Sequence, residues 1–375
     1  MAAPRSVPVP RAAWPFAAAL CAAMLGGRVG AEELPQPSLG AGTALLQERH
    51  LAVGQLVDWL SARDTRGSWD WSAAAAMLAL GRLRAREAIP VLAEHHSFYS
   101  ASFGQIRPSD FPALLSLAAI GLPAMPSLTG IAAEGWGGGP VNIPLQHCLC
   151  TMAHGRMIRQ MVLQAADREA DPARAQRLRE TARYVGGRGS LQPPRSLIVF
   201  RLAELQTTIV EALDPRVAEA IAIAERCEAA AKDLSDWLVS LDAIQQESRE
   251  TQGAAVAAME LLGKFRLPEG IPGLKKHWSF VRPGEDGREL EDYPALTAIM
   301  EIDLPAFEAL VEIAVEGHEG KAITWPLTEV FAKMGPADAV AEVIERHADR
   351  EIDPDRYKRL METAAAVREG RDESQ

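Results

Sequence analysis

An internal repeat at a fixed offset constrains the fold of this chain more than any other feature of its sequence. Residues 75–81 read Ala-Ala-Met-Leu-Ala-Leu-Gly, and residues 257–263 read Ala-Ala-Met-Glu-Leu-Leu-Gly. Further pairs at the same offset are 89–90 and 271–272, 95–98 and 277–280, 110–114 and 292–296, and 171–172 and 353–354. We infer that one segment was duplicated, so the chain holds two copies of one folding unit.

The repeat divides the 375 residues into five parts. The chain is longer than the roughly 250–300 residues at which one compact core stops growing, which favours two lobes. A Gly- and Pro-rich stretch at 186–194 is typical of a linker, and an additional helix is expected at 197–213. The predicted parts are a signal peptide at 1–31, a first lobe at 32–185, a linker plus additional helix at 186–221, a second lobe at 222–367 and a polar tail at 368–375.

The spacing of apolar residues predicts an all-α fold. Ile89, Leu92, Ala93 and His96 lie at i, i+3, i+4 and i+7, which places them on one helix face. No segment alternates apolar and polar residues over a β-branched run, so strands are not expected. We expect each copy to begin with a leading helix, at 44–62 and 222–240, followed by three antiparallel helix pairs and a closing helix.

Turn and capping residues predict where these helices begin and end. Asp110 and Asp171 each precede a proline by one or two residues, as an N-cap does before a proline in the first turn. Gly81 and Gly263 are expected to end the helices that precede them, because glycine is favoured just after a helix.

The repeated segment resembles a known helical repeat. Ala75-Ala76, Leu80-Gly81 and Ala88-Ile89-Pro90, then Leu92, are similar to the HEAT-type (armadillo-like) repeat, and the second copy has the same residues at most of these positions. The resemblance implies two HEAT-like lobes that form an α-solenoid of stacked helical hairpins with a protein-binding surface. It implies no catalytic chemistry. The segments 99–109 and 281–291 interrupt the pattern in both copies.

The amino-terminal segment 1–31 has the features of a secretory signal. Arg5 and Arg11 precede an apolar run at 12–25, and Val29-Gly30-Ala31 offers a small-residue cleavage site. The run is shorter than the ~20 residues that span a bilayer, so the mature chain is expected to be secreted or periplasmic, without a membrane span. A retained anchor, including lipidation at Cys21, stays an alternative.

The charge of the chain bears on its partners. The net charge is −11, which disfavours a nucleic-acid partner. Residues 72–185 carry eleven Lys and Arg against eight Asp and Glu, whereas residues 254–367 carry thirteen against twenty-two. Because both segments derive from one unit, one hypothesis is that the lobes bind different partners, with cationic partners preferred by the second lobe. Surface drift under a solubility constraint is the other interpretation.

One cluster has the chemistry of soft metal ligands: His147, Cys148, Cys150 and His154. It could hold zinc or copper on one helix face. The repeat favours packing instead, because the second copy has Val330 and Ala332 where the first has the two cysteines. We therefore predict no metal and no cofactor.

The candidate binding residues are those that recur after the second helix of each copy: His95, Ser97 and Phe98 with His277, Ser279 and Phe280. The functional interpretation is a paired ligand contact at the base of two equivalent loops. The structural interpretation is a helix C-terminus that favours a cationic side chain.

The sequence therefore predicts an exported, non-catalytic binding or scaffolding protein that uses solenoid surfaces to contact other proteins. The alternative is an enzyme, a lyase or hydrolase on a helical scaffold, with His95 or His277 as the general base.

Overall fold

A computed structural model describes residues 38–63, 70–100, 107–135, 142–152, 154–187, 193–208, 213–318, 321–323 and 325–370. The predicted signal peptide lies outside these residues, as do parts of the predicted linker and tail. The described part of the chain contains no β-strand; its one bridge pairs His318 with Lys321. The all-α fold class is therefore confirmed. None of the helices described combines the length and apolar character that a membrane span needs.

Seventeen α-helices pack together in the described residues, and we refer to 38–208 and 213–370 as the first and second halves. The helices of the first half are α1 (Leu39–Ser61), α2 (Trp71–Arg82), α3 (Ile89–Glu94), α4 (Pro112–Ile120), α5 (Met125–Glu134), α6 (Ile143–Thr151), α7 (Gly155–Arg168), α8 (Pro172–Gly187) and α9 (Pro194–Thr208). Those of the second half are α10 (Pro215–Ser240), α11 (Arg249–Phe265), α12 (Ile271–Lys276), α13 (Pro294–Ile302), α14 (Phe307–Glu316), α15 (Leu327–Met334), α16 (Ala337–Ala348) and α17 (Pro354–Glu369).

The two halves present the same elements in the same order. Helices α3, α4 and α5 recur as α12, α13 and α14, and both ends of each helix are shifted by the offset of the sequence repeat. The short 3-10 helices Pro108–Asp110 and Leu122–Ala124 recur with the same shift as Leu290–Asp292 and Leu304–Ala306. Among the described helices of the first half, only α9 has no counterpart in this order.

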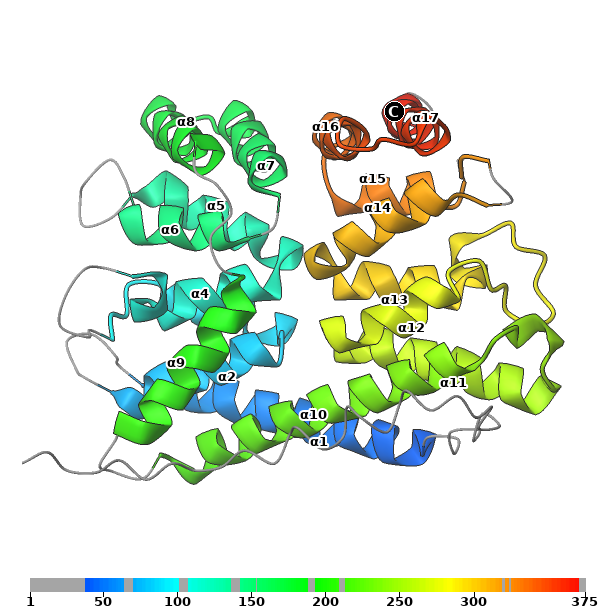
Figure 1. Cartoon of the computed structure of the whole chain (residues 1–375). Helices are drawn as coiled ribbons and strands as arrows, with labels where there is room; N and C mark the ends of the chain where they lie inside the picture. Colours follow the sequence, from blue (N-terminus) through cyan, green and yellow to red (C-terminus); the bar gives the residue numbers. More distant parts are fainter. Residues whose placement is uncertain are drawn as a thin grey trace, which may run out of the picture. The chain divides into compact units, whose positions relative to one another are not determined.

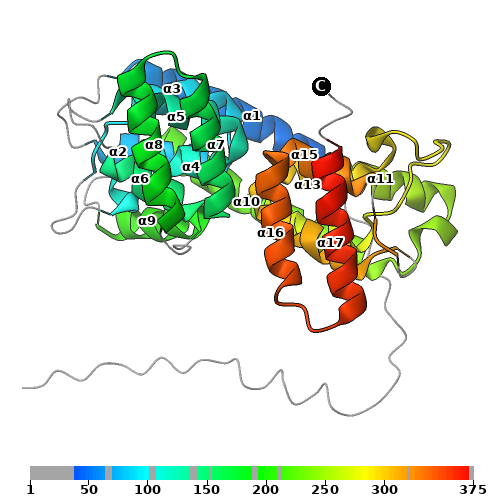
Figure 2. The ribbon, with the colours of Figure 1, turned by 90° about the horizontal axis from the view of Figure 1, so that it is seen from above.

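Helices α1 and α10 join the halves. They pack against each other, and both contact α2 and α11, so each of them touches both halves (Figure 1). The inward faces of both helices are buried, including Leu56 and Trp59 of α1 and Trp237 and Leu238 of α10. The apolar side chains of the two halves consequently form one continuous core. Farther along the chain, α7 of the first half also contacts α16 of the second (Figure 2).

Both leading helices begin earlier than predicted. The side chain of Ser38 accepts a hydrogen bond from the Ala41 N–H, and α1 starts at Leu39. Asp214 caps α10 at the Arg216 N–H, and Pro215 occupies the first turn. The additional helix, α9, spans Pro194–Thr208 rather than 197–213.

The glycines at the predicted helix ends lie inside helices instead, at a close helix contact. Gly81 belongs to α2 and Gly263 to α11. A Cβ at Gly81 would lie 2.5 Å from the Ser116 hydroxyl oxygen, and one at Gly263 would lie 3.0 Å from Ala298 Cα. The missing side chain therefore lets α2 approach α4 and α11 approach α13. The helices end after these glycines, and the chain reverses at the residues that follow.

Only one of the two predicted aspartate caps starts an α-helix. The Asp171 carboxylate accepts hydrogen bonds from the N–H groups of Ala173 and Arg174 in α8, as predicted. Asp110 instead ends a 3-10 turn, where its carboxylate accepts from the Arg107 N–H at 2.9 Å. The Asp292 carboxylate accepts the equivalent hydrogen bond from the Glu289 N–H, so the same short turn forms in both halves.

Candidate functional site

The two predicted histidines each lie beside the last turn of a leading helix. His95 Nε2 is 3.2 Å from the Leu60 carbonyl oxygen, and His277 Nε2 is 2.7 Å from that of Leu238. Because a carbonyl only accepts, each Nε2 must carry a proton to make this bond. Burial lowers the pKa of His277, so its ring is neutral near pH 7. In this geometry Nε2 donates to the backbone and cannot act as a general base, and in the neutral ring the lone pair is on Nδ1.

The residues that accompany these histidines separate into core and surface. Phe98 and Phe280 are buried in the core, whereas Ser97 is exposed and Ser279 is half-buried. The structure therefore does not gather the six predicted residues around one cavity. Both loops that follow begin with an equivalent backbone hydrogen bond, from Ser100 to Asp110 and from Arg282 to Asp292. Residues 101–106 of the first loop lie outside the described part of the chain.

The cysteine and histidine cluster is divided between different environments. Cys148 and Cys150 are both buried, and burial strongly raises the pKa of the Cys148 thiol. The His147 ring stacks on Tyr184, with ring centroids 5.7 Å apart. The backbone of His154 has a left-handed conformation, with φ of +57°, and its ring packs on Phe307 of the second half. Over the residues described, no group of three or more metal-type ligands converges.

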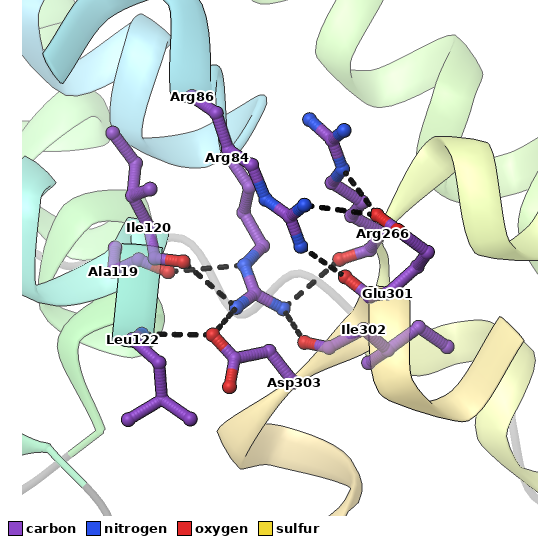
Figure 3. Close-up of polar contacts among 9 residues, drawn as sticks. All are labelled: Arg84, Arg86, Ala119, Ile120, Leu122, Arg266, Glu301, Ile302 and Asp303. Atoms are coloured by element: carbon purple, nitrogen blue, oxygen red, sulfur yellow. Dashed lines mark hydrogen bonds and ion pairs between the residues drawn. The ribbon is translucent and has the colours of Figure 1, made fainter. Parts of the chain in front are cut away.

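Sequence inspection missed a buried arginine at the contact between the halves. Arg84 is 4% exposed, and its guanidinium donates to four carbonyl oxygens (Figure 3). Two belong to the end of α4, at Ala119 (3.0 Å) and Ile120 (3.1 Å). Two belong to the second half, at Arg266 (3.0 Å) and Ile302. One side chain thus joins the carboxyl ends of three helices, where the helix dipole favours a cation.

An aspartate completes this contact from the second half. The Asp303 carboxylate lies 3.9 Å from the Arg84 guanidinium and accepts a hydrogen bond of 2.8 Å from the Leu122 N–H. Burial raises the pKa of Asp303 to about 6 and lowers that of Arg84 to about 10. Near pH 7 both groups are therefore charged, and each offsets part of the desolvation of the other.

A more exposed set of charges surrounds the buried pair. Arg86 and Arg266 both reach the Glu301 carboxylate, at 3.0 and 3.3 Å (Figure 3). Because Glu301 is 44% exposed, both pairs are screened by water. Only the Arg86–Glu301 pair joins the two halves, and it does so more weakly than the buried pair; Arg266 and Glu301 both belong to the second half. We refer to Arg84, Arg86, Arg266, Glu301 and Asp303 as the junction cluster.

The repeat offset is the sequence signal that marks this cluster. Arg84 and Arg266 are equivalent positions, and both have positive φ, +50° and +59°. Gly121 and Asp303 are also equivalent and have φ of +94° and +72°. A Cβ at Gly121 would lie 2.5 Å from the Asp303 carboxylate. The two copies therefore share the arginine but differ at the second position, because a side chain at Gly121 would overlap the Asp303 carboxylate.

A cleft of about 770 Å³ lies next to the junction cluster, because one of its lining residues, Leu122, donates its N–H to Asp303 of that cluster. We call it the inter-half cleft, because α5, α7 and α8 form one side and the end of α15 with the turn to α16 forms the other. Its lining residues are Leu122, Met125, Pro126, Thr129, Gly130, Ala133, Met161, Gln164, Ala165, Arg168, Glu169, Arg174, Leu178, Ala332, Lys333, Met334, Gly335 and Pro336.

The cleft combines an apolar floor with charged groups. Met125, Met161 and Met334 offer flexible thioether side chains, which adapt to a partner's shape. Glu169 accepts a 3.0 Å hydrogen bond from Arg174, which lowers the pKa of this carboxyl group. The Thr129 hydroxyl donates to the Met125 carbonyl. The described lining contains no histidine, cysteine or serine.

A second cavity, of about 370 Å³, is lined mainly by residues of α11 and α13. Its walls include Arg266 and Glu301 of the junction cluster and the ion pair between Arg282 and Glu260. It has about half the volume of the inter-half cleft, which leaves the inter-half cleft as the stronger candidate site.

No protein-family model matches this chain, and no curated protein matches it either.

Proposed function

We propose that this protein is a non-catalytic binding or scaffolding protein and that the inter-half cleft holds a protein partner. The observation that carries the proposal is the cleft itself: about 770 Å³ of space with a methionine-rich floor and a charged rim. A volume of that size accommodates several side chains of a partner. The predicted catalytic histidines are outside its lining, which disfavours the enzyme alternative.

The proposal includes the architecture. In it, residues 32–185 and 222–367 are two HEAT-like lobes of an α-solenoid that arose by duplication. The constant shift that relates α3, α4 and α5 to α12, α13 and α14 supports a common origin of the lobes. In solenoids, contacts between neighbouring helix pairs leave an extended surface free for partners, and the proposal assigns the cleft to such a surface.

The proposal also includes export. The signal at 1–31 would direct the chain to a secreted or periplasmic location, where the partner would be met. Amino-terminal sequencing of the mature protein tests this part, with Glu32 as the expected first residue.

Site-specific photo-crosslinking tests the binding role. A photoreactive phenylalanine at Thr129, in the cleft, is compared with one at Arg159, an exposed residue of α7 outside it. We expect a discrete protein adduct in the exported fraction from position 129 alone. Equal adducts from both positions, or none from position 129, would refute the assignment of the cleft.

A further inference from the structure

The inter-half cleft is lined by residues whose counterparts at the repeat offset pack against one another. Residues of the cleft wall correspond, at the repeat offset, to residues that pack together elsewhere in the molecule. Met125 corresponds to Phe307, Ala165 to His347, and Pro336 to His154. In each pair the counterpart has an aromatic ring, whereas the cleft residue has none. We call the set Phe307, His347 and His154 the filled site, and its side chains indicate which groups the cleft lacks.

In the filled site, the ring of His154 from the first half meets side chains of the second half, which are two rings and a carboxylate. The rings of His154 and Phe307 are tilted against each other, with centroids 4.4 Å apart. Glu308 lies between two imidazoles, with its oxygens 3.8 Å from His154 Nε2 and 3.4 Å from His347 Nε2. The His154 side chain is only 8% exposed, so these groups close the contact between α14, α16 and the start of α7.

The cleft lacks the same groups. Pro126 stands where the counterpart has Glu308, so the wall supplies no carboxylate at that position. Met125 and Met161 line the cleft, and the sulfur of a methionine makes favourable contacts with aromatic ring edges. An occupant that reproduces the filled site would therefore bring an aromatic ring and an acidic group.

The charges of the cleft favour an acidic occupant. Arg168, Arg174 and Lys333 line it, against the single carboxylate of Glu169. Arg174 already pairs with Glu169, and Lys333 pairs with Glu329 at 3.0 Å. In the described part of the chain no ion pair involves Arg168, which is exposed at the end of α7. A carboxylate brought by a partner would meet no competing carboxylate at this guanidinium among the described residues.

We propose, building on the proposed function, that the inter-half cleft recognises an acidic segment of a partner protein with an aromatic anchor. The aromatic side chain enters between α5 and α7 beside Met125 and Met161. The adjacent carboxylate pairs with Arg168. The rest of the segment covers the apolar floor toward Met334 and Pro336.

Binding of defined peptides to the whole mature chain tests this proposal. The probes are three fluorescein-labelled peptides of equal length: a central Phe flanked by Glu, the same Phe flanked by Lys, and a central Ala flanked by Glu. Fluorescence anisotropy should give the first peptide an affinity about tenfold or more above the other two, because only it supplies both groups.

Three variants locate the binding. Ala165→Phe places a ring of the protein's own in the cleft, and Arg168→Glu reverses the charge at its rim. Both should weaken the acidic aromatic peptide by about tenfold or more. Arg159→Glu is the matched control, because Arg159 lies on the opposite face of α7, and it should leave the affinity within about twofold. Thermal unfolding monitors the folding of each variant.

The proposal is overturned if the peptides flanked by Glu and Lys bind equally, or if Ala165→Phe and Arg168→Glu bind as the wild type does. It is also overturned if a copurified small molecule fills the cleft and competes with the peptide. These results leave the proposed function intact when the adduct at position 129 still forms. Loss of that adduct, by contrast, removes the binding role itself.

Discussion

Replacing Arg84 with methionine should destabilise the protein far more than the same change at Arg266. Methionine keeps most of the apolar stem and removes only the guanidinium. At position 84 the change removes the donor from four carbonyl oxygens, at Ala119, Ile120, Arg266 and Ile302. It also leaves Asp303 without its counter-charge.

The expected magnitude follows from the burial of these groups. Removing one partner of a buried pair costs about 3–5 kcal/mol, and that range includes part of the cost of the unsatisfied carbonyls. Arg266 pairs with a half-exposed glutamate, so its loss should cost at most about 1 kcal/mol. Both arginines have positive φ, so the backbone cost of the substitution is nearly the same and cancels in the comparison.

Urea unfolding followed by far-UV circular dichroism measures the difference. A second readout is its pH dependence. Without Arg84 the Asp303 carboxyl protonates more readily, so Arg84→Met should be less harmful at pH 5 than at pH 8. Equal destabilisation by the two variants would show that the arginine does not hold the halves together. Equal effects at both pH values would show that the Asp303 charge is not the cause.

The remaining predictions concern three other features of the fold. Because the folded pKa of Asp303 is raised to about 6, its contribution to stability is full below its unfolded pKa and is lost as the pH rises through about 6. The unfolding free energy of wild type minus that of Asp303→Asn should therefore fall by about 3 kcal/mol between pH 4 and pH 7, and a constant difference would contradict this. His277→Ala should cost more than His95→Ala, about 2 against about 1 kcal/mol in chemical denaturation, because His277 is more buried and makes the shorter hydrogen bond. In thermal melts, Gly81→Ala should destabilise the protein by about 1–3 kcal/mol, because the added Cβ would overlap Ser116. Gly253→Ala should stabilise it by about 0.5–1 kcal/mol, because a Cβ there meets nothing within 4 Å. The opposite order would refute the close-contact explanation.

The candidate site was only partly accessible from the sequence. The interpretation of Cys148 and Cys150 as packed side chains agrees with their burial, because the apolar residues of the second copy already indicated a core position. The recurrence of His95 and His277 singled out two residues that each bond to the end of a leading helix. It could not distinguish a ligand contact from a hydrogen bond to a leading helix, because that bond joins residues far apart in the chain.

The sequence by itself determined the helical class and the order of the helices. Both are local properties: apolar spacing selects helix over strand, and Asp171 followed by Pro172 fixes a helix start within one turn. The internal repeat added that the order occurs twice.

The tertiary structure alone decided where the halves meet and where a cleft remains. Arg84 bonds to Ile302, far along the chain in the other half, and no local pattern encodes which helix ends will face each other. Gly81 illustrates the same limit: its sequence context favours a helix end, yet the approach of α4 makes it a contact point inside α2. The cleft exists because side chains distant in the chain, such as Ala165 and Pro336, are small where docked helices leave space.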